Sequence, residues 1–174
     1  MIKQLLFLIT FIPLICYAKP LTDTDIQRLE KRTIKEHIIY ESYLETDKGL
    51  ASVFGYQFDT YFNDTQCFVL AISGAVGGER GGYGFAAFGL GQQVPLNKKW
   101  SLNFRGLIGS GGGGGLKAGG GFMLTAHAGI IYNVSNTLGI ELNTGYLTYP
   151  TGTFSTPMVN IGIQMTQTSV FLPW

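Results

Sequence analysis

From residue 52 onward, large apolar side chains alternate with small or polar ones. This period of two predicts β-strands. Seven segments show the pattern, at 52–62, 68–72, 82–93, 100–108, 122–133, 137–146 and 159–166. In most of them the large apolar residues occupy either the even or the odd positions, so each strand has one apolar face and one face of small and polar residues. The facing of 82–93 stays open, because Phe85 and Phe88 have opposite parity.

The connections between these segments alternate in length. Compact polar turns are expected at 63–65, 96–98 and 133–136, and Gly- or Pro-rich loops at 77–82, 109–121 and 149–157. Such alternation is typical of outer-membrane barrels, which have short periplasmic turns and longer outer loops. An eighth strand at 37–45 would make the strand number even and return both termini to the same side.

Charged residues are sparse and unevenly placed, which favours a sheet that faces lipid over a soluble sheet. Charged residues make up 13% of the chain, against about a quarter in ordinary soluble domains. None follows Glu141. A wall that faces lipid excludes charge at mid-depth. The net charge of +1 gives no reason to expect a nucleic-acid partner.

The first residues indicate export. Lys3 precedes an apolar stretch from Leu5 to Ile15, and cleavage by a signal peptidase is expected after Ala18. We therefore divide the chain into a signal peptide at 1–18, a helical lead-in at 19–36 and a β-barrel domain at 37–174. The lead-in contains a predicted amphipathic helix from Thr22 to Lys35. Cys67 is the one cysteine of the predicted mature chain, and we interpret it as a small strand residue.

Signal peptide, dyad pattern, loop alternation and the terminal Trp174 together resemble the small eight-stranded outer-membrane barrels of the OmpX, Opacity and OmpA-domain kind. The resemblance implies an all-β fold, an antiparallel up-and-down transmembrane β-barrel after a short N-terminal helix. It also implies an outer-membrane location and membrane lipid as partner, with lipopolysaccharide among the candidates. The polar segment Thr166–Ser169 departs from that type, which indicates either a bulge or a tail outside the wall. The alternative architecture is a secreted or periplasmic soluble β-barrel or sandwich that acts as a binding module.

One constellation carries candidate chemistry. His127, Glu141 and Arg105 fall on the non-apolar parity of their strands, and we expect the 133–136 turn to bring His127 and Glu141 opposite or diagonal to each other. The structural interpretation is a lumen network that satisfies buried charges. The catalytic interpretation is a His–Glu pair, which resembles that of the lipid A deacylases of the outer membrane. In that family a serine stands two residues after the histidine, whereas Gly129 stands there in this chain.

Three further features bear on function. A helix before eight strands also resembles the lipid A palmitoyltransferase, although only the architecture carries that likeness. Gly111–Gly115 followed by Lys117 lacks the order of a phosphate-binding loop, so no nucleotide is expected. No metal or other cofactor is indicated. The sequence thus predicts a non-enzymatic outer-membrane protein with an envelope-structural or surface-interaction role, with a lipid A-modifying enzyme as the alternative.

Overall fold

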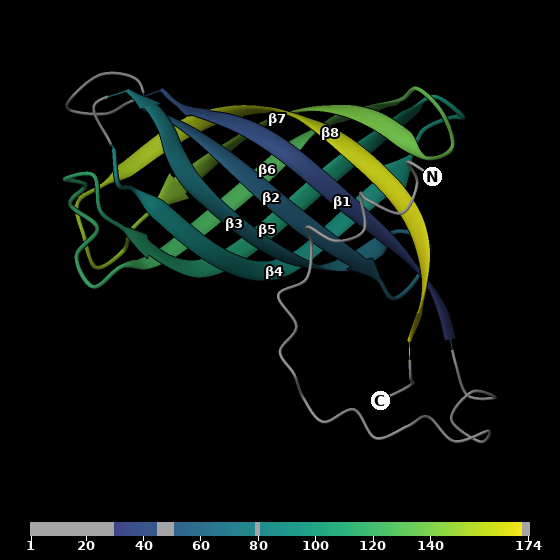
Figure 1. The fold of residues 1–174 in the computed structure, drawn as a ribbon, viewed down its shortest axis with the longest axis horizontal. Coiled ribbons are helices and arrows are strands. Elements are labelled where there is room, and N and C mark those ends of the chain that lie inside the picture. Colours follow the sequence, from purple (N-terminus) through teal and green to yellow (C-terminus); the bar gives the residue numbers. More distant parts are fainter. Residues whose placement is uncertain (1–29, 45–50, 79–80, 172–174) are drawn as a thin grey trace, which may run out of the picture. The chain divides into compact units, whose positions relative to one another are not determined.

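The computed structural model describes residues 30–44, 51–78 and 81–171, which form a closed barrel of eight strands (Figure 1). Every strand pairs antiparallel with the next along the chain. The strands are β1 (Glu30–Tyr43), β2 (Ala51–Tyr61), β3 (Gln66–Gly78), β4 (Gly84–Pro95), β5 (Trp100–Gly112), β6 (Phe122–Asn133), β7 (Leu138–Thr148) and β8 (Ser155–Phe171). The all-β, up-and-down architecture expected from the sequence is confirmed.

Contacts between β1 and β8 close the barrel. The Leu44 amide donates to the Pro157 carbonyl at 3.0 Å, and inside the lumen Asn160 Nδ2 donates to Glu41 Oε2 at 3.2 Å. Closure leaves no unpaired strand edge, which is a condition for placing a sheet in a lipid environment.

The two faces of the wall differ as the sequence pattern predicts. Phe104 and Ile140 point outward with 47% and 46% of their surface exposed, whereas Asn103 and Asn143 point into the lumen at 1% and 2%. The parity of 82–93 is now settled, because Phe88 is exposed on the outside at 48% and β4 buries its odd positions such as Ala87. The wall is therefore apolar outside and encloses the buried charged and amide side chains, the reverse of a soluble barrel.

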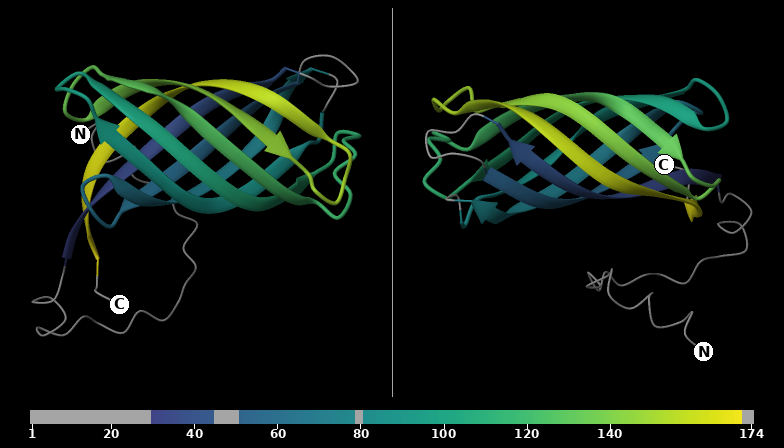
Figure 2. Two further views of the ribbon diagram at one scale, coloured as in Figure 1. Left: turned by 180° about the vertical axis from the view of Figure 1, so that it is seen from behind. Right: turned by 90° about the horizontal axis from the view of Figure 1, so that it is seen from above.

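Short turns and longer loops gather at opposite ends of the barrel (Figure 2). Each short turn is fixed by one polar side chain that accepts two backbone N–H groups. Asn63 Oδ1 accepts from Thr65 and Gln66 at 2.9 and 2.7 Å, Asn97 Oδ1 accepts from Lys99 and Trp100 at 2.8 and 3.0 Å, and Ser135 Oγ accepts from Thr137 and Leu138 at 3.2 and 3.1 Å. The start of β1 and the end of β8 lie at the short-turn end (Figure 1).

Two expectations about the barrel's ends are corrected. The segment 30–35 is strand rather than helix, because β1 starts at Glu30 and its backbone pairs with β2, with Ile34 opposite Thr60. At the other end the polar segment 166–169 is not detached from the barrel, since it belongs to β8, which continues to Phe171, and Gln167 Nε2 donates to Glu36 on β1 at 2.6 Å.

The predicted signal peptide, the remainder of the predicted helix at 22–29 and the terminal Trp174 lie outside the described residues. Among the residues that the structure describes, no helix is long and apolar enough to cross a bilayer.

Candidate functional site

Four buried charged side chains from four strands meet in the lumen. Arg105 on β5 lies between two carboxylates, with Nη2 3.2 Å from Asp59 Oδ2 and Nη1 3.1 Å from Glu141 Oε2. His37 on β1 joins the same carboxylates from the other side, with Nε2 3.1 Å from Asp59 Oδ2 and Nδ1 3.0 Å from Glu141 Oε1. We call this closed arrangement of alternating charges the charge ring. It combines the predicted Arg105 and Glu141 with His37 and Asp59, which the sequence reasoning missed.

The hydrogen-bond geometry of the ring favours a balanced charge. A carboxylate only accepts hydrogen bonds, so both nitrogens of His37 must carry a proton to donate to Asp59 and Glu141. With both contacts made as hydrogen bonds His37 is an imidazolium, and Arg105 Nη2, itself only a donor, lies 3.3 Å from His37 Nε2. Together with Arg105 it balances the two carboxylates, so the ring is neutral although each member is almost completely buried. Neutrality is what makes such burial tolerable, because an unpaired charge in a low-dielectric interior costs several kcal/mol.

Two amides complete the ring. Gln57 Nε2 donates to Asp59 Oδ1 at 2.8 Å, and Asn103 Nδ2 donates to Glu141 Oε2 at 3.3 Å. All four carboxylate oxygens consequently accept at least one hydrogen bond. The arrangement positions and neutralises its members, and it presents no free nucleophile or base.

His127 belongs to a different cluster, so its predicted pairing with Glu141 is wrong. The register of β6 and β7 pairs His127 with Gly145 and Glu141 with Ile131, four positions away. The hydrogen bonds of His127 go instead to Thr125, whose Oγ1 lies 3.0 Å from Nε2, and to Asn160, whose Nδ2 lies 3.1 Å from Nδ1. Glu41 Oε2 stands 4.0 Å from Nδ1.

Thr125, His127 and Glu41 have the order of a hydroxyl, a base and an acid, but the hydrogen bonds oppose catalysis. Asn160 must direct its NH₂ toward Glu41 and His127, because its Oδ1 accepts from Asn143 Nδ2 at 2.6 Å. His127 Nδ1 is then an acceptor and Nε2 carries the proton, which it donates to Thr125. A base that activates the Thr125 hydroxyl needs the opposite tautomer.

Aromatic side chains fill the lumen at the end with the long loops. Tyr83 Oη lies 2.9 Å from Tyr149 Oη and 3.3 Å from Tyr43 Oη, and the Phe154 ring packs 6.3 Å from that of Tyr43. Burial raises the pKa of Tyr83 and of Tyr149, so both hydroxyls stay protonated and able to donate. Fully buried Met123, Leu147 and Met158 pack in the same cluster. At the long-loop end the lumen thus holds a packed cluster of aromatic and apolar side chains.

The glycine-rich segment 109–121 forms the end of β5 and the loop 113–121. Gly113, Gly114, Gly115, Gly119 and Gly121 have positive φ, a conformation that glycine adopts without strain. The loop leads into β6 rather than a helix, and its backbone binds the neighbouring loop, where the Thr153 amide donates to the Lys117 carbonyl at 3.0 Å. The segment is therefore a structural loop, and a phosphate-binding function has no support in its geometry. Cys67 is buried on β3, as a strand residue.

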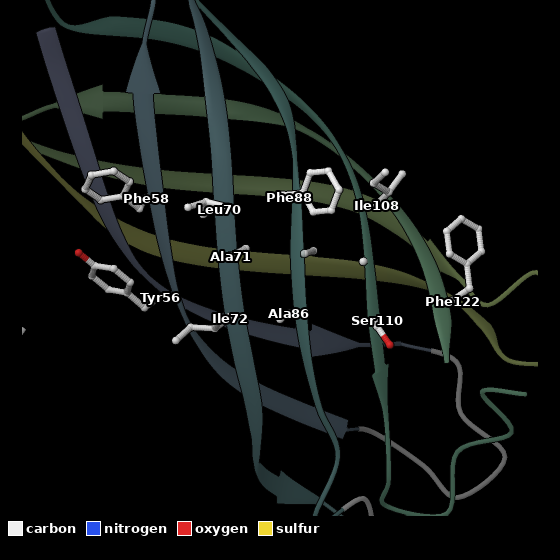
Figure 3. Close-up of a pocket in the computed structure, with 12 residues that line it drawn as sticks. Tyr56, Phe58, Leu70, Ala71, Ile72, Ala86, Phe88, Ile108, Ser110 and Phe122 are labelled. Atoms are coloured by element: carbon white, nitrogen blue, oxygen red, sulfur yellow. The ribbon is translucent and has the colours of Figure 1, made fainter. Parts of the chain in front are cut away.

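An apolar groove lies on the outside of the wall, over β2 to β6 (Figure 3). Phe58, Leu70, Phe88, Ile108 and Phe122 border it, and the small side chains of Ala86 and Ser110 leave the space between them. This groove has a volume of about 760 Å³, and sequence reasoning did not find it. The signal that could have shown it is the pair of small residues at outward positions of adjacent strands.

Comparison with known proteins identifies the fold. No protein-family model matches the chain, and no curated protein does. A de novo designed transmembrane β-barrel superposes with a TM-score of 0.56 at 16% identity, covering 78% of this chain and 95% of the other. Neisserial surface protein A gives 0.51 at 10% identity, with 78% and 98% covered. The N-terminal barrel domain of OprF from Pseudomonas aeruginosa gives 0.50 at 9% identity, with 78% and 97% covered.

These likenesses extend over almost the whole of each other chain. They show that the protein has the fold of the small eight-stranded transmembrane β-barrels, as the sequence resemblance implied.

Proposed function

We propose that the protein is a non-enzymatic β-barrel of a bacterial outer membrane, with an envelope-structural or surface-interaction role. The observation that carries this proposal is the distribution of polarity in the wall, with apolar side chains outside and charged side chains inside. Large apolar side chains such as Leu90 and Ile72 are 63% and 59% exposed on the outside, while the charge ring is buried inside. Only a lipid environment makes that distribution favourable, because an apolar band of this extent would drive a soluble protein to aggregate.

A filled lumen argues against transport. Eight strands enclose a space that side chains can fill, and here the aromatic cluster and the charge ring occupy it, with a polar pocket of about 280 Å³ left at the short-turn end. The His127 tautomer argues against lipid A modification, as does the inward direction of its side chain, which bonds Thr125 and Asn160. What remains is a rigid body in the membrane that presents loops at one end, which suits a structural or surface-contact role.

The location is tested by fractionation of cells that express the full chain. The mature protein is expected to begin at Lys19, to sediment with outer membranes and to resist extraction by carbonate. Recovery of most of the folded protein in the soluble periplasm would contradict the proposal.

The absence of enzymatic activity is tested by mass spectrometry of lipid A from cells that express the parent, His127→Ala or Glu141→Gln. The acyl-chain composition is expected to equal that of cells without the protein in every case. A chain added or removed by the parent and by neither variant, with both variants inserted, would instead establish an enzyme.

A further inference from the structure

The groove on the outside of the wall has a defined shape that follows from the strand register. Ala86 on β4 stands directly opposite Ser110 on β5, and these two small outward residues are flanked in the same row by Ile72 on β3 and Phe122 on β6. In Figure 3 the side chains of Ile72 and Phe122 stand on either side of Ala86 and Ser110. The row therefore forms a trough two strands wide with bulky walls.

The trough is closed toward mid-barrel and open toward the long loops. One row nearer the short turns, the outward positions are Leu70, Phe88 and Ile108, which block it. One row nearer the long loops, they are Gly74, Gly84 and Gly112, which have no side chain to block it. From Gly84 to Phe88 the chain rises about 13 Å along the strand, or roughly 10 Å along the membrane normal at a tilt of about 40°. That depth is most of one leaflet's hydrocarbon layer of about 15 Å.

The lining is almost wholly apolar. The groove has a volume of about 760 Å³, and of its twelve lining residues only Tyr56 and Ser110 carry a polar side-chain atom. A second outer groove, toward the short turns, differs because it is more polar. Gln66, Gln92, Arg105 and His127 are among the residues that line it. The first groove thus matches a linear hydrocarbon that enters from the loop end of the barrel.

The geometry points to one occupant. If the long loops face outward from the cell, as the proposed function requires, we infer that the groove bordered by Phe88, Ile108 and Phe122 holds one acyl chain of a lipopolysaccharide molecule of the outer leaflet. The inference rests on the proposed outer-membrane location. Among the described outer loops, at 81–83, 113–121 and 149–154, the one charged side chain is Lys117, on the loop that joins β5 to β6. A cation there suits the phosphate of a lipid A head group.

The preference of the groove for one acyl chain over the surrounding lipid must come from close packing. Hydrocarbon gains nothing from leaving other lipid tails, so only close van der Waals contact and the head-group charge can hold one molecule longer than its neighbours. A recess that is smooth, deep and open at the head-group level provides that contact, whereas a convex wall does not.

The test fills the groove and counts the lipid that remains bound. The full-length barrel is extracted from outer membranes in mild detergent, and native mass spectrometry measures bound lipopolysaccharide and phospholipid per barrel. Ala86→Phe occupies the trough. Ala128→Phe is the matched control, because Ala128 is an outward position of β6 between Phe104 and Thr144, away from the groove.

Parent and Ala128→Phe are expected to retain about one lipopolysaccharide each, and Ala86→Phe to retain it about tenfold less, which corresponds to 1.4 kcal/mol. Lys117→Gln is expected to lower retention by a smaller factor. If Ala86→Phe fails to insert, Ser110→Leu fills the same trough and is measured in its place.

Equal retention in Ala86→Phe and Ala128→Phe overturns the inference, and so does phospholipid in place of lipopolysaccharide. A dimer that Ala86→Phe disrupts also overturns it and assigns the groove to a second copy of the chain. These outcomes are distinct from a failure of the proposed function, which would show earlier, as a parent protein that does not sediment with outer membranes.

Discussion

Glu141 on β7 crosses β8 to reach His37 on β1, where its Oε1 lies 3.0 Å from the imidazole Nδ1. The Glu141 side chain can pass over β8 because the β8 residue paired with Glu141 is Gly162, which has no side chain. A side chain at 162 would begin 2.8 Å from Glu141 Oε1. A glycine on the lumen face thus allows contact between strands that are not neighbours.

Glutamine at position 141 should be strongly destabilising. Glu141 accepts on both oxygens, from His37 on one and from Arg105 and Asn103 on the other, and a glutamine has only one acceptor oxygen. Glu141→Gln also leaves the charge ring with a net positive charge. Its free energy of unfolding is expected to fall by about 3–5 kcal/mol, as when one partner of a buried pair is removed. Urea unfolding in lipid vesicles, followed by tryptophan fluorescence, measures the loss.

A double substitution separates charge balance from lost contacts. His37→Gln combined with Glu141→Gln leaves only Arg105 and Asp59 charged in the ring, which is again neutral. The double variant should therefore be more stable than the sum of the two single losses predicts, by about 0.5–3 kcal/mol. Additive losses would mean that the ring is not held together by charge.

Alanine at position 162 should disturb the crossing directly. Its Cβ would lie 2.8 Å from the Glu141 carboxylate and 2.9 Å from the Ile38 carbonyl, both closer than real Cβ contacts allow. Gly162→Ala is expected to lower the free energy of unfolding by about 1–3 kcal/mol. The matched control is Gly106→Ala on β5, where nothing lies within 4 Å of the added Cβ. If both variants unfold at the same urea concentration, Glu141 does not cross at Gly162.

The facing of the strands was predictable because it depends on a single local property. Side chains alternate between the two faces of any strand, and lipid and lumen select opposite polarity, so Phe104 and Asn103 could be assigned to opposite sides from sequence alone. The same reasoning failed for Phe85 and Phe88 on β4, because a large residue can fill the lumen as well as face the lipid.

The meeting of residues inside the lumen was not predictable, because it depends on register. Placing the turn at 133–136 puts residue 128 opposite Glu141, whereas the structure pairs Ile131 with it. The centre of the turn was thus placed one and a half residues too early, and such an error shifts the residue opposite Glu141 by twice that amount, or three residues. His37 and Asp59 were missed for a further reason, since only closure of the barrel brings β1 near β7.

Local pattern also failed at the start of β1. Residues Glu30 to Lys35 were expected to end a helix, yet they extend the strand because β2 offers backbone partners as far as Thr60, opposite Ile34. A partner strand that is distant in sequence can override a local helical spacing, which carries little free energy by itself.

Arginine on the outer wall should act according to depth. Leu142 lies near the middle of β7 and Leu138 at its short-turn end, and they are 51% and 39% exposed. Leu142→Arg is expected to destabilise the inserted barrel by about 2–4 kcal/mol and Leu138→Arg by about 0–1 kcal/mol, since the cost of charge peaks at the bilayer midplane. Reversible unfolding from lipid vesicles gives both values. A soluble barrel would show no such dependence on depth, so equal costs would argue against insertion.

The two described loops at 113–121 and 149–154 should open together when their backbone contact is disturbed. The Thr153 amide donates to the Lys117 carbonyl at 3.0 Å, and Gly152 packs so closely against that carbonyl and Ala118 that an added Cβ would collide with backbone. Gly152→Ala should weaken the contact by about 1–3 kcal/mol and raise the population of open loops about tenfold for each 1.4 kcal/mol. Trypsin added to intact cells reports the opening, because cleavage after Lys117 requires a free loop, and mass spectrometry identifies the fragments.

Gly120→Ala is the matched control, since its Cβ would meet only Thr151 Oγ1 at 3.6 Å, an ordinary contact. We expect cleavage after Lys117 to be fast in Gly152→Ala and slow in both the parent and Gly120→Ala. Fast cleavage in the parent would show that the loops are not clasped, and protection of all three chains in cells but not in lysates would place these loops on the periplasmic side.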